Sequence, residues 1–118
     1  MEATPIIVRT VIGKSIAAMD SDGQIVYEKM TRMYERYGHV TVSFTGIDLL
    51  TTAFLNASFG RFIIAAHSAV EGKIRAANCT FTYLINSKMY SQLDNVRELA
   101  LDSDFSAAHD AAMMDEYA

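Results

Sequence analysis

The sequence predicts an α/β fold: a single domain with a mixed, mostly parallel sheet of about four strands and helices packed against it. Three observations support this prediction. The 118 residues are enough for one hydrophobic core and too few for two ordinary domains. Short β-branched runs alternate with longer segments in which apolar residues recur at helical spacing. Such alternation favours parallel pairing, because each helix returns the chain to the same end of the sheet.

The first third of the chain begins with β-branched residues. Pro5–Ile12 is expected to form a strand, and Gly13–Met19 either a second strand or a loop. An amphipathic helix is expected over Ser21–Tyr37. An S-x-x-Q capping box opens this helix, and a glycine follows its last residue in the position typical of a C-cap.

The middle of the chain repeats the strand-then-helix order. His39–Phe44 alternates apolar and polar residues, which predicts a strand. Gly46–Leu50 is expected to be a short connection. Thr51 or Thr52 then caps a helix that runs to about His67. This helix is apolar nearly all round, which predicts burial.

The last third adds one more strand and one or two helices. Ser68–Ala77 is interpreted as a solvated turn or short helix, and Cys79–Ile85 as a strand. Asn86–Ser87 opens a further helix. Residues 1–101 are therefore assigned to the domain. The segment 102–118 holds five acids and no Lys or Arg, and is interpreted as a last helix or a frayed end.

Charge and composition argue against several classes of function. The net charge of −4 and the pI near 5.2 disfavour nucleic-acid binding and a polybasic membrane anchor. No apolar run approaches the roughly 20 residues that span a bilayer, and the start of the sequence lacks the features of a signal peptide. A single cysteine is consistent with the reducing cytoplasm. The expected protein is cytoplasmic and does not contact a membrane.

The sequence contains no recognisable catalytic, nucleotide-binding or metal-binding motif. It has no G-x-S-x-G elbow, no complete P-loop and no H-x-x-x-H or C-x-x-C spacing. We therefore expect no catalytic residue, no metal and no cofactor. A small enzyme that uses Cys79 or His67 is the weakest of the hypotheses, because no partner residues surround either one in a known pattern.

Thr51 and Thr52 are the candidate functional residues. One N-cap needs only one hydroxyl, so the second is available to face solvent. In parallel sheets, sites form beyond the carboxyl ends of strands, where helices begin, and these threonines lie at such a junction. A phosphate there would be favoured by the positive end of the helix dipole and would repel a docking protein. A phosphorylation switch is chemically available at this position.

Residues 21–60, SDGQIVYEKMTRMYERYGHVTVSFTGIDLLTTAFLNASFG, resemble the STAS-like domain of unknown function. That family has a capped helix, a strand that ends in a D-F-x-G-V-like segment, and a hydroxyl-rich S-S-F motif that opens a helix. Here the corresponding segments are SFTGI and TTAF. The resemblance implies a STAS-like fold.

The chain is more distantly similar to the STAS domains of anti-sigma factor antagonists, which carry D-S-S-G-L-G at this junction. The alignment places Thr51 at the phosphorylated serine and Thr52 at the second serine. Leu50 stands at the aspartate, and Ala53 and Leu55 stand at the two glycines.

The family resemblance implies a non-enzymatic regulatory module that binds a protein, with a histidine-kinase-type ATPase as one candidate partner. We expect the contact surface at the junction and at the adjoining start of the first helix, formed by Ser21, Asp22, Thr51, Thr52, Ala53 and Phe54. An exposed edge strand, with Pro5–Ile12 as the candidate, would invite pairing, so a homodimer is also expected. The alternative function is a small acidic inhibitor or decoy, for example from a phage or mobile element, that binds a host complex through residues 102–118.

Overall fold

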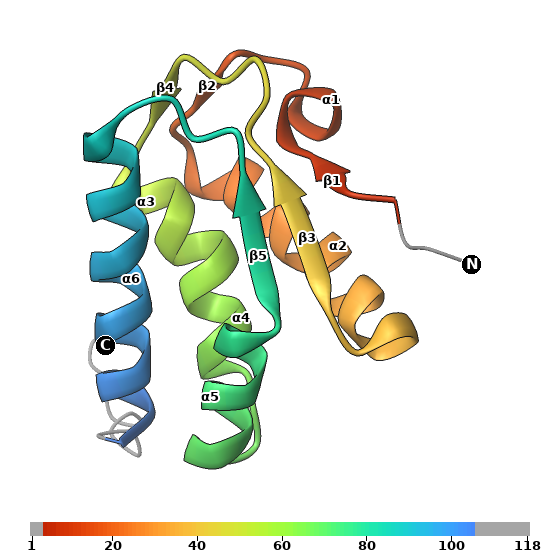
Figure 1. The fold of residues 1–118 in the computed structure, drawn as a ribbon, viewed down its shortest axis with the longest axis vertical. Helices are drawn as coiled ribbons and strands as arrows, with labels where there is room; N and C mark the ends of the chain where they lie inside the picture. The colour runs from red at the N-terminus through yellow and green to blue at the C-terminus, as the bar shows by residue number, and fades with distance from the viewer. Residues whose placement is uncertain (1–3, 106–118) are drawn as a thin grey trace.

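The computed structural model describes residues 4–105 of the chain. In this part, short strands alternate with helices, and every pair of neighbouring strands is parallel (Figure 1). The predicted α/β class and the parallel pairing are therefore confirmed. The strands are divided between two small sheets, one with the order β1-β3-β5 and one that pairs β2 with β4.

The strands are shorter than the sequence predicts. The first sheet contains β1 (Ile6–Ile7), β3 (Val40–Ser43) and β5 (Cys79–Thr82), and the second contains β2 (Ile16–Ala17) and β4 (Leu49–Leu50). β4 lies in the segment that was expected to be a connection, so that expectation is wrong at these two residues. β1 is an edge strand of only two residues, and a homodimer paired through it stays a prediction.

The expected strand over Pro5–Ile12 is wrong in its second half, because Val8–Ile12 forms helix α1. Gly13 ends this helix with a φ of 73° and donates its backbone N–H to the Arg9 carbonyl at 2.8 Å. Val8 is fully buried, and the neighbouring Arg9 is exposed. Burial of one side of the turn against the core overrides the strand preference of its β-branched residues.

Helix α2 spans Asp20–Tyr37 and ends where the sequence predicts. Gly38 has a φ of 77° and donates its N–H to the Tyr34 carbonyl at 2.8 Å. The start of the helix differs from the prediction. Its cap residue is Met19, which makes no side-chain capping bond, so the expected capping box is wrong and Ser21 lies inside the first turn.

A continuous helical run follows β4. It comprises α3 (Thr52–Leu55), a π-helical turn labelled η1 (Asn56–Gly60) and α4 (Arg61–Ile64). The Ser58 hydroxyl is buried and donates to the Phe54 carbonyl at 2.9 Å. Back-bonding of this kind accompanies distortions of helices, and single π-helical turns inside α-helices recur at functional sites.

The last two helices have side-chain caps. The Ser68 hydroxyl accepts a backbone N–H at the start of α5 (Ala69–Ala77), so this segment is a helix rather than a turn. The Asn86 side chain does the same for α6 (Ser87–Phe105). α6 crosses the expected boundary between the domain and the acidic segment. The prediction for the rest of that segment lies outside the described residues.

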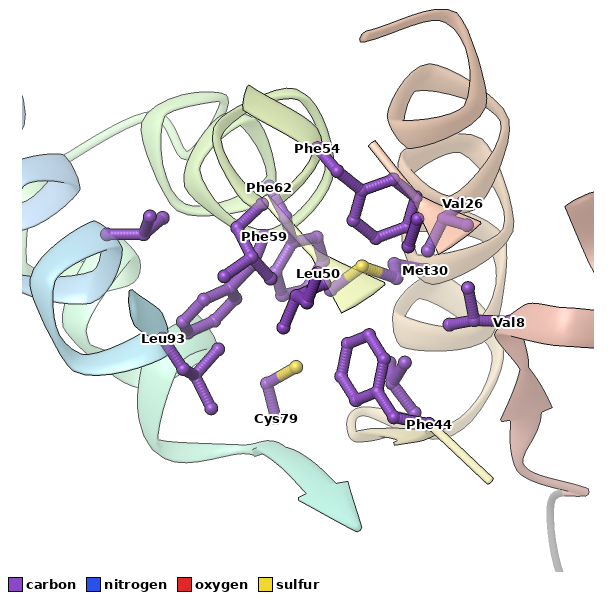
Figure 2. Close-up of a cluster of buried hydrophobic side chains, with 14 of the residues drawn as sticks. Val8, Val26, Met30, Phe44, Leu50, Phe54, Phe59, Phe62, Cys79 and Leu93 are labelled. Atoms are coloured by element: carbon purple, nitrogen blue, oxygen red, sulfur yellow. The ribbon is translucent and has the colours of Figure 1, made fainter. Parts of the chain in front are cut away.

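The core is centred on the helical run that follows β4, which contacts both α2 and α6. Figure 2 shows Phe54, Phe59 and Phe62 from this run gathered with side chains from the strands and from the other helices. The Phe59 ring lies edge-on to Phe81 of β5, with a centroid distance of 4.7 Å. The run therefore fixes the two flanking helices and the sheet relative to one another.

Candidate functional site

The two-stranded sheet places the starts of two helices side by side. β2 and β4 pair in parallel register, Ile16 with Leu49 and Ala17 with Leu50. β2 leads within two residues into α2, and β4 leads directly through Thr51 into α3. The carboxyl ends of both strands therefore meet at one edge, as expected for the junction in a parallel sheet.

The Thr51 hydroxyl stabilises this edge both as a hydrogen-bond donor and as a hydrogen-bond acceptor. Its Oγ1 donates to the Ala18 carbonyl at 2.9 Å and accepts from the Phe54 backbone N–H at 3.2 Å. Its backbone N–H also donates to the Ala17 carbonyl, at 3.0 Å. The prediction that one threonine caps the helix is confirmed, and Thr51 is the one that does so. The same side chain ties the end of β2 to the start of α3.

Thr52 differs from its neighbour. It is the first residue of α3, it is exposed, and its hydroxyl has no hydrogen-bond partner within residues 4–105. The structure thus divides the two hydroxyls between two roles. The Thr51 hydroxyl makes hydrogen bonds that stabilise the fold, and Thr52 is exposed at the start of α3.

The other expected contact residues fall into an exposed and a buried group. Ser21 and Ala53 are exposed. Asp22 is largely buried, and its Oδ2 lies 2.6 Å from the Lys14 ammonium. Phe54 is fully buried in the core. Asp22 and Phe54 therefore support the edge from beneath, whereas Ser21 and Ala53 are exposed to solvent.

Sequence reasoning missed three apolar residues at this edge. Ile16 and Leu49, which pair across β2 and β4, are each 47% exposed, and Met19 is 57% exposed. Their strand neighbours Ala17 and Leu50 point into the core. The alternation of inward and outward residues was the only available signal, and strands of two residues are too short to display it. We call the exposed set the junction surface, formed by Ile16, Met19, Ser21, Leu49, Thr52 and Ala53.

A close helix crossing lies directly behind the junction surface. A Cβ atom on Gly23 of α2 would lie 2.6 Å from the Phe54 carbonyl oxygen and 2.7 Å from the Ala57 Cβ. Only glycine allows the two backbones to approach this closely. The first turn of α2 and the run that begins at Thr52 are therefore packed in contact, and the junction surface has a rigid support.

The residues considered for an enzyme do not form a reactive group. Cys79 is buried, and burial raises the pKa of its thiol from 9.0 to about 12, although the nearby Arg97 charge acts in the opposite direction. The thiol is therefore protonated at neutral pH and is a poor nucleophile. His67 is exposed in the turn that precedes α5.

Within residues 4–105, no group of three or more His, Cys, Asp or Glu side chains is placed to hold a metal ion. Over the same residues, no helix combines the length and the apolar character needed to cross a membrane.

Fold and site together define a small α/β domain with parallel strands, whose exposed edge lies where two helices begin. A family model described as a STAS-like domain of unknown function matches residues 22–83, more than half of the chain. The chain belongs to this family. The match contains Thr51 and Thr52 and most of the segment in which the resemblance was recognised. Comparisons with curated proteins and with solved structures found no match.

Proposed function

We propose that this protein is a regulatory module that works in the cytoplasm by binding another protein through the junction surface. The observation that carries this proposal is the exposed pair Ile16 and Leu49, of which Leu49 lies on the strand that leads through Thr51 to the exposed Thr52. Apolar side chains bordered by polar ones are typical of the centre and rim of a protein–protein interface. The membership of the STAS-like family supports an interaction role.

The rigid support of this surface favours recognition without large rearrangement. Thr51 ties β2 to α3, and Gly23 keeps α2 against the same helical run. A partner therefore meets two helix starts and two strand ends in a fixed relation. Pre-organised surfaces of this kind lose little conformational entropy when they bind.

We further propose that Thr52, rather than Thr51, is the phosphoacceptor of a switch. Modification of Thr51 would require its hydroxyl to leave both the Ala18 carbonyl and the Phe54 N–H. Thr52 is exposed and needs no such change. A phosphate on Thr52 would lie in the first turn of α3, where the helix dipole favours negative charge, and would add roughly −1.5 to −2 charges to the junction surface.

The candidate partner is an ATPase of the histidine-kinase type, which would supply both the docking surface and the phosphoryl group of ATP. In this reaction the Thr52 hydroxyl oxygen forms a bond to the γ-phosphorus, the bond from that phosphorus to the ADP oxygen breaks, and the hydroxyl proton is released. Family membership supports this choice of partner, because STAS-like domains resemble modules that act with such ATPases.

The test is to compare capture of a purified candidate ATPase by the wild-type protein and by two variants. Ile16→Lys combined with Leu49→Lys places two charges in the proposed contact and should abolish capture. Val70→Lys is the matched control, because Val70 is 68% exposed on α5, away from the junction surface. Equal capture by all three folded proteins would refute the junction surface as the binding site.

A further inference from the structure

The connection from β5 to α6 begins with a residue in a strained backbone conformation. Tyr83 has a φ of 63°, which lies in the left-handed region that residues with a side chain rarely adopt. Within residues 4–105, the other left-handed positions are all glycines, at Gly13, Gly38 and Gly46. A tyrosine in this conformation costs free energy that a glycine would not. Strain of this kind is concentrated at functional sites, which makes Tyr83 a candidate for one.

The left-handed turn changes which side chains face the core. Strand alternation would direct Tyr83 to the same side as Cys79 and Phe81, which pack in the core. Instead, Leu84 is buried and Tyr83 is 67% exposed. The phenol of Tyr83 makes no hydrogen bond or ring contact within the described residues. The conformation therefore presents the ring to solvent, where it contributes nothing to the core.

Two further large side chains are exposed close to Tyr83 in the sequence. Ile85 is 61% exposed, and Tyr90, in the first turn of α6, is 54% exposed. Residues 79–93 contain no Asp or Glu and one base, the exposed Lys88. Lys88 makes no ion pair within the described residues. We call these four residues the tyrosine surface. It is apolar with one positive charge, on a chain whose net charge is −4.

The tyrosine surface lies near the junction surface. Figure 1 shows the connection from β5 to α6 at the end of the molecule that holds β2 and β4. The Gln92 side chain of α6 donates to the Leu50 carbonyl of β4 at 3.0 Å. Leu50 is the chain neighbour of Leu49, which belongs to the junction surface. A protein that binds the junction surface can therefore also contact the start of α6.

We propose that Tyr83 is an anchor residue for the protein that binds the junction surface. Its ring enters an apolar pocket of that partner, and carboxylates beside the pocket pair with Lys88 and accept a hydrogen bond from the Tyr83 hydroxyl. Tyrosine is typical of such anchors because it combines a large apolar area with a polar tip. Charge complementarity with Lys88 selects the carboxylates. The proposal rests on the function proposed above, because it extends the same interface.

The first test measures the affinity of the purified candidate ATPase for the wild-type protein and for variants at position 83. Tyr83→Gly should weaken binding tenfold or more. Tyr83→Phe keeps the ring and loses only the hydroxyl, so its affinity should fall several-fold. The matched control is Tyr37→Ala, which removes an exposed tyrosine at the last residue of α2, roughly 25 Å from the start of that helix. Its affinity should equal that of the wild type.

Thermal unfolding of the same proteins separates binding from stability. Tyr83→Gly should unfold at or above the wild-type midpoint, because glycine removes the strain. Tyr83→Ala removes the ring but keeps the strain, so it should unfold at a lower temperature than Tyr83→Gly and bind equally weakly. A residue that serves only the fold would instead lose stability and affinity together.

The second test concerns the charge. Lys88→Gln should lower the affinity several-fold at low ionic strength, and the difference from the wild type should shrink at high salt, because exposed charge contacts are screened. Lys29→Gln is the matched control, since it removes an exposed lysine from α2 and changes the net charge equally. Equal losses in the two variants would overturn the assignment of carboxylates to the partner's pocket.

The outcomes distinguish this proposal from the one on which it rests. Wild-type affinity of Tyr83→Gly, together with lost capture by the Ile16→Lys, Leu49→Lys protein, would overturn the anchor role alone. Equal capture by all variants, or no capture by the wild type, would overturn both proposals. A wild-type dimer that Tyr83→Gly converts to a monomer in sedimentation would assign the tyrosine surface to a second copy of the chain and overturn the anchor role.

Discussion

The Thr51 hydroxyl donates a hydrogen bond of 2.9 Å to the carbonyl oxygen of Ala18, which lies 33 residues earlier in the chain. The bond connects the end of β2 with the start of α3. The same oxygen caps the helix by accepting the Phe54 N–H. Thr51 was expected to cap a helix and was a candidate phosphoacceptor and contact residue. Its side chain also joins two elements that lie far apart in the sequence.

Thr51→Val should destabilise the protein by about 2–4 kcal/mol. The substitution keeps the shape of the side chain but removes the cap, worth about 1 kcal/mol, and leaves the Ala18 carbonyl without this donor at a further cost of about 1–3 kcal/mol. Urea unfolding measures the effect as a lower midpoint at an unchanged slope.

The neighbouring position provides the control for this prediction. Thr52→Val should change the free energy of unfolding by less than about 0.5 kcal/mol, because its hydroxyl is exposed and makes no bond within the described residues. Similar losses at the two positions would contradict the division of roles between the two threonines.

Gly23→Ala should destabilise the protein by more than about 2 kcal/mol, although alanine favours a helix over glycine by about 1 kcal/mol. The added Cβ would lie 2.6 Å from the Phe54 carbonyl oxygen and 2.7 Å from the Ala57 Cβ. Both distances are far inside van der Waals contact, so the two helical segments must separate. Thermal unfolding should show a lower midpoint.

A second substitution tests the cause of this loss. Adding Ala57→Gly removes the clash with the side chain but leaves the clash with the Phe54 carbonyl, so it should restore only part of the stability. No restoration, or a Gly23→Ala variant as stable as the wild type, would mean that the helices do not cross as closely as described.

Phosphorylation, if the proposed partner catalyses it, should occur on Thr52. Incubation with the candidate ATPase and ATP should raise the intact mass by one phosphate in the wild type and in Thr51→Ser, but not in Thr52→Ala. Thr51→Ser preserves the capping hydroxyl, so this variant should fold like the wild type while the side chain at position 51 is changed. Labelling of Thr52→Ala that persists and maps to position 51 would transfer the acceptor role to Thr51.

The raised pKa of Cys79 should make the free energy of unfolding fall as the pH rises above 9. Burial raises its folded-state pKa to about 12, whereas the ordinary value is 9.0. Below pH 9 both states keep the proton, so the thiol contributes no pH dependence. Between pH 9 and 12 the unfolded state loses the proton first, and stability should fall by up to about 1.4 kcal/mol per pH unit.

The measurement for this prediction is the pH dependence of the difference in unfolding free energy between the wild type and Cys79→Ala. The comparison cancels other groups that titrate in the same range. The advantage of the wild type over the variant should shrink above pH 9. A difference that stays constant to pH 11 would contradict the raised pKa.

Features that follow from local sequence were predictable. The end of α2 at Gly38 and the cap at Thr51 depend on glycine in a left-handed conformation and on one hydroxyl at a helix start. The capping box failed because α2 begins one residue earlier, and Ser21 is then inside the helix.

Features that depend on tertiary contacts were not predictable. Val8–Ile12 has the composition of a strand but forms α1, because one side of it packs on the core. β2 and β4 have two residues each and become strands only by pairing with each other. The exposed apolar residues Ile16 and Leu49 are recognisable as part of a site only after this pairing is known.

The pairing of β2 with β4 has a consequence for how the protein is recognised. Ile16 and Leu49 are separated along the chain by helix α2 and strand β3, and they are neighbours only in the folded domain. The loop-closure entropy of bringing them together is offset only by the whole fold. A partner that needs both side chains would therefore discriminate against nascent or unfolded chains, and an isolated peptide from either half would compete poorly with the intact domain.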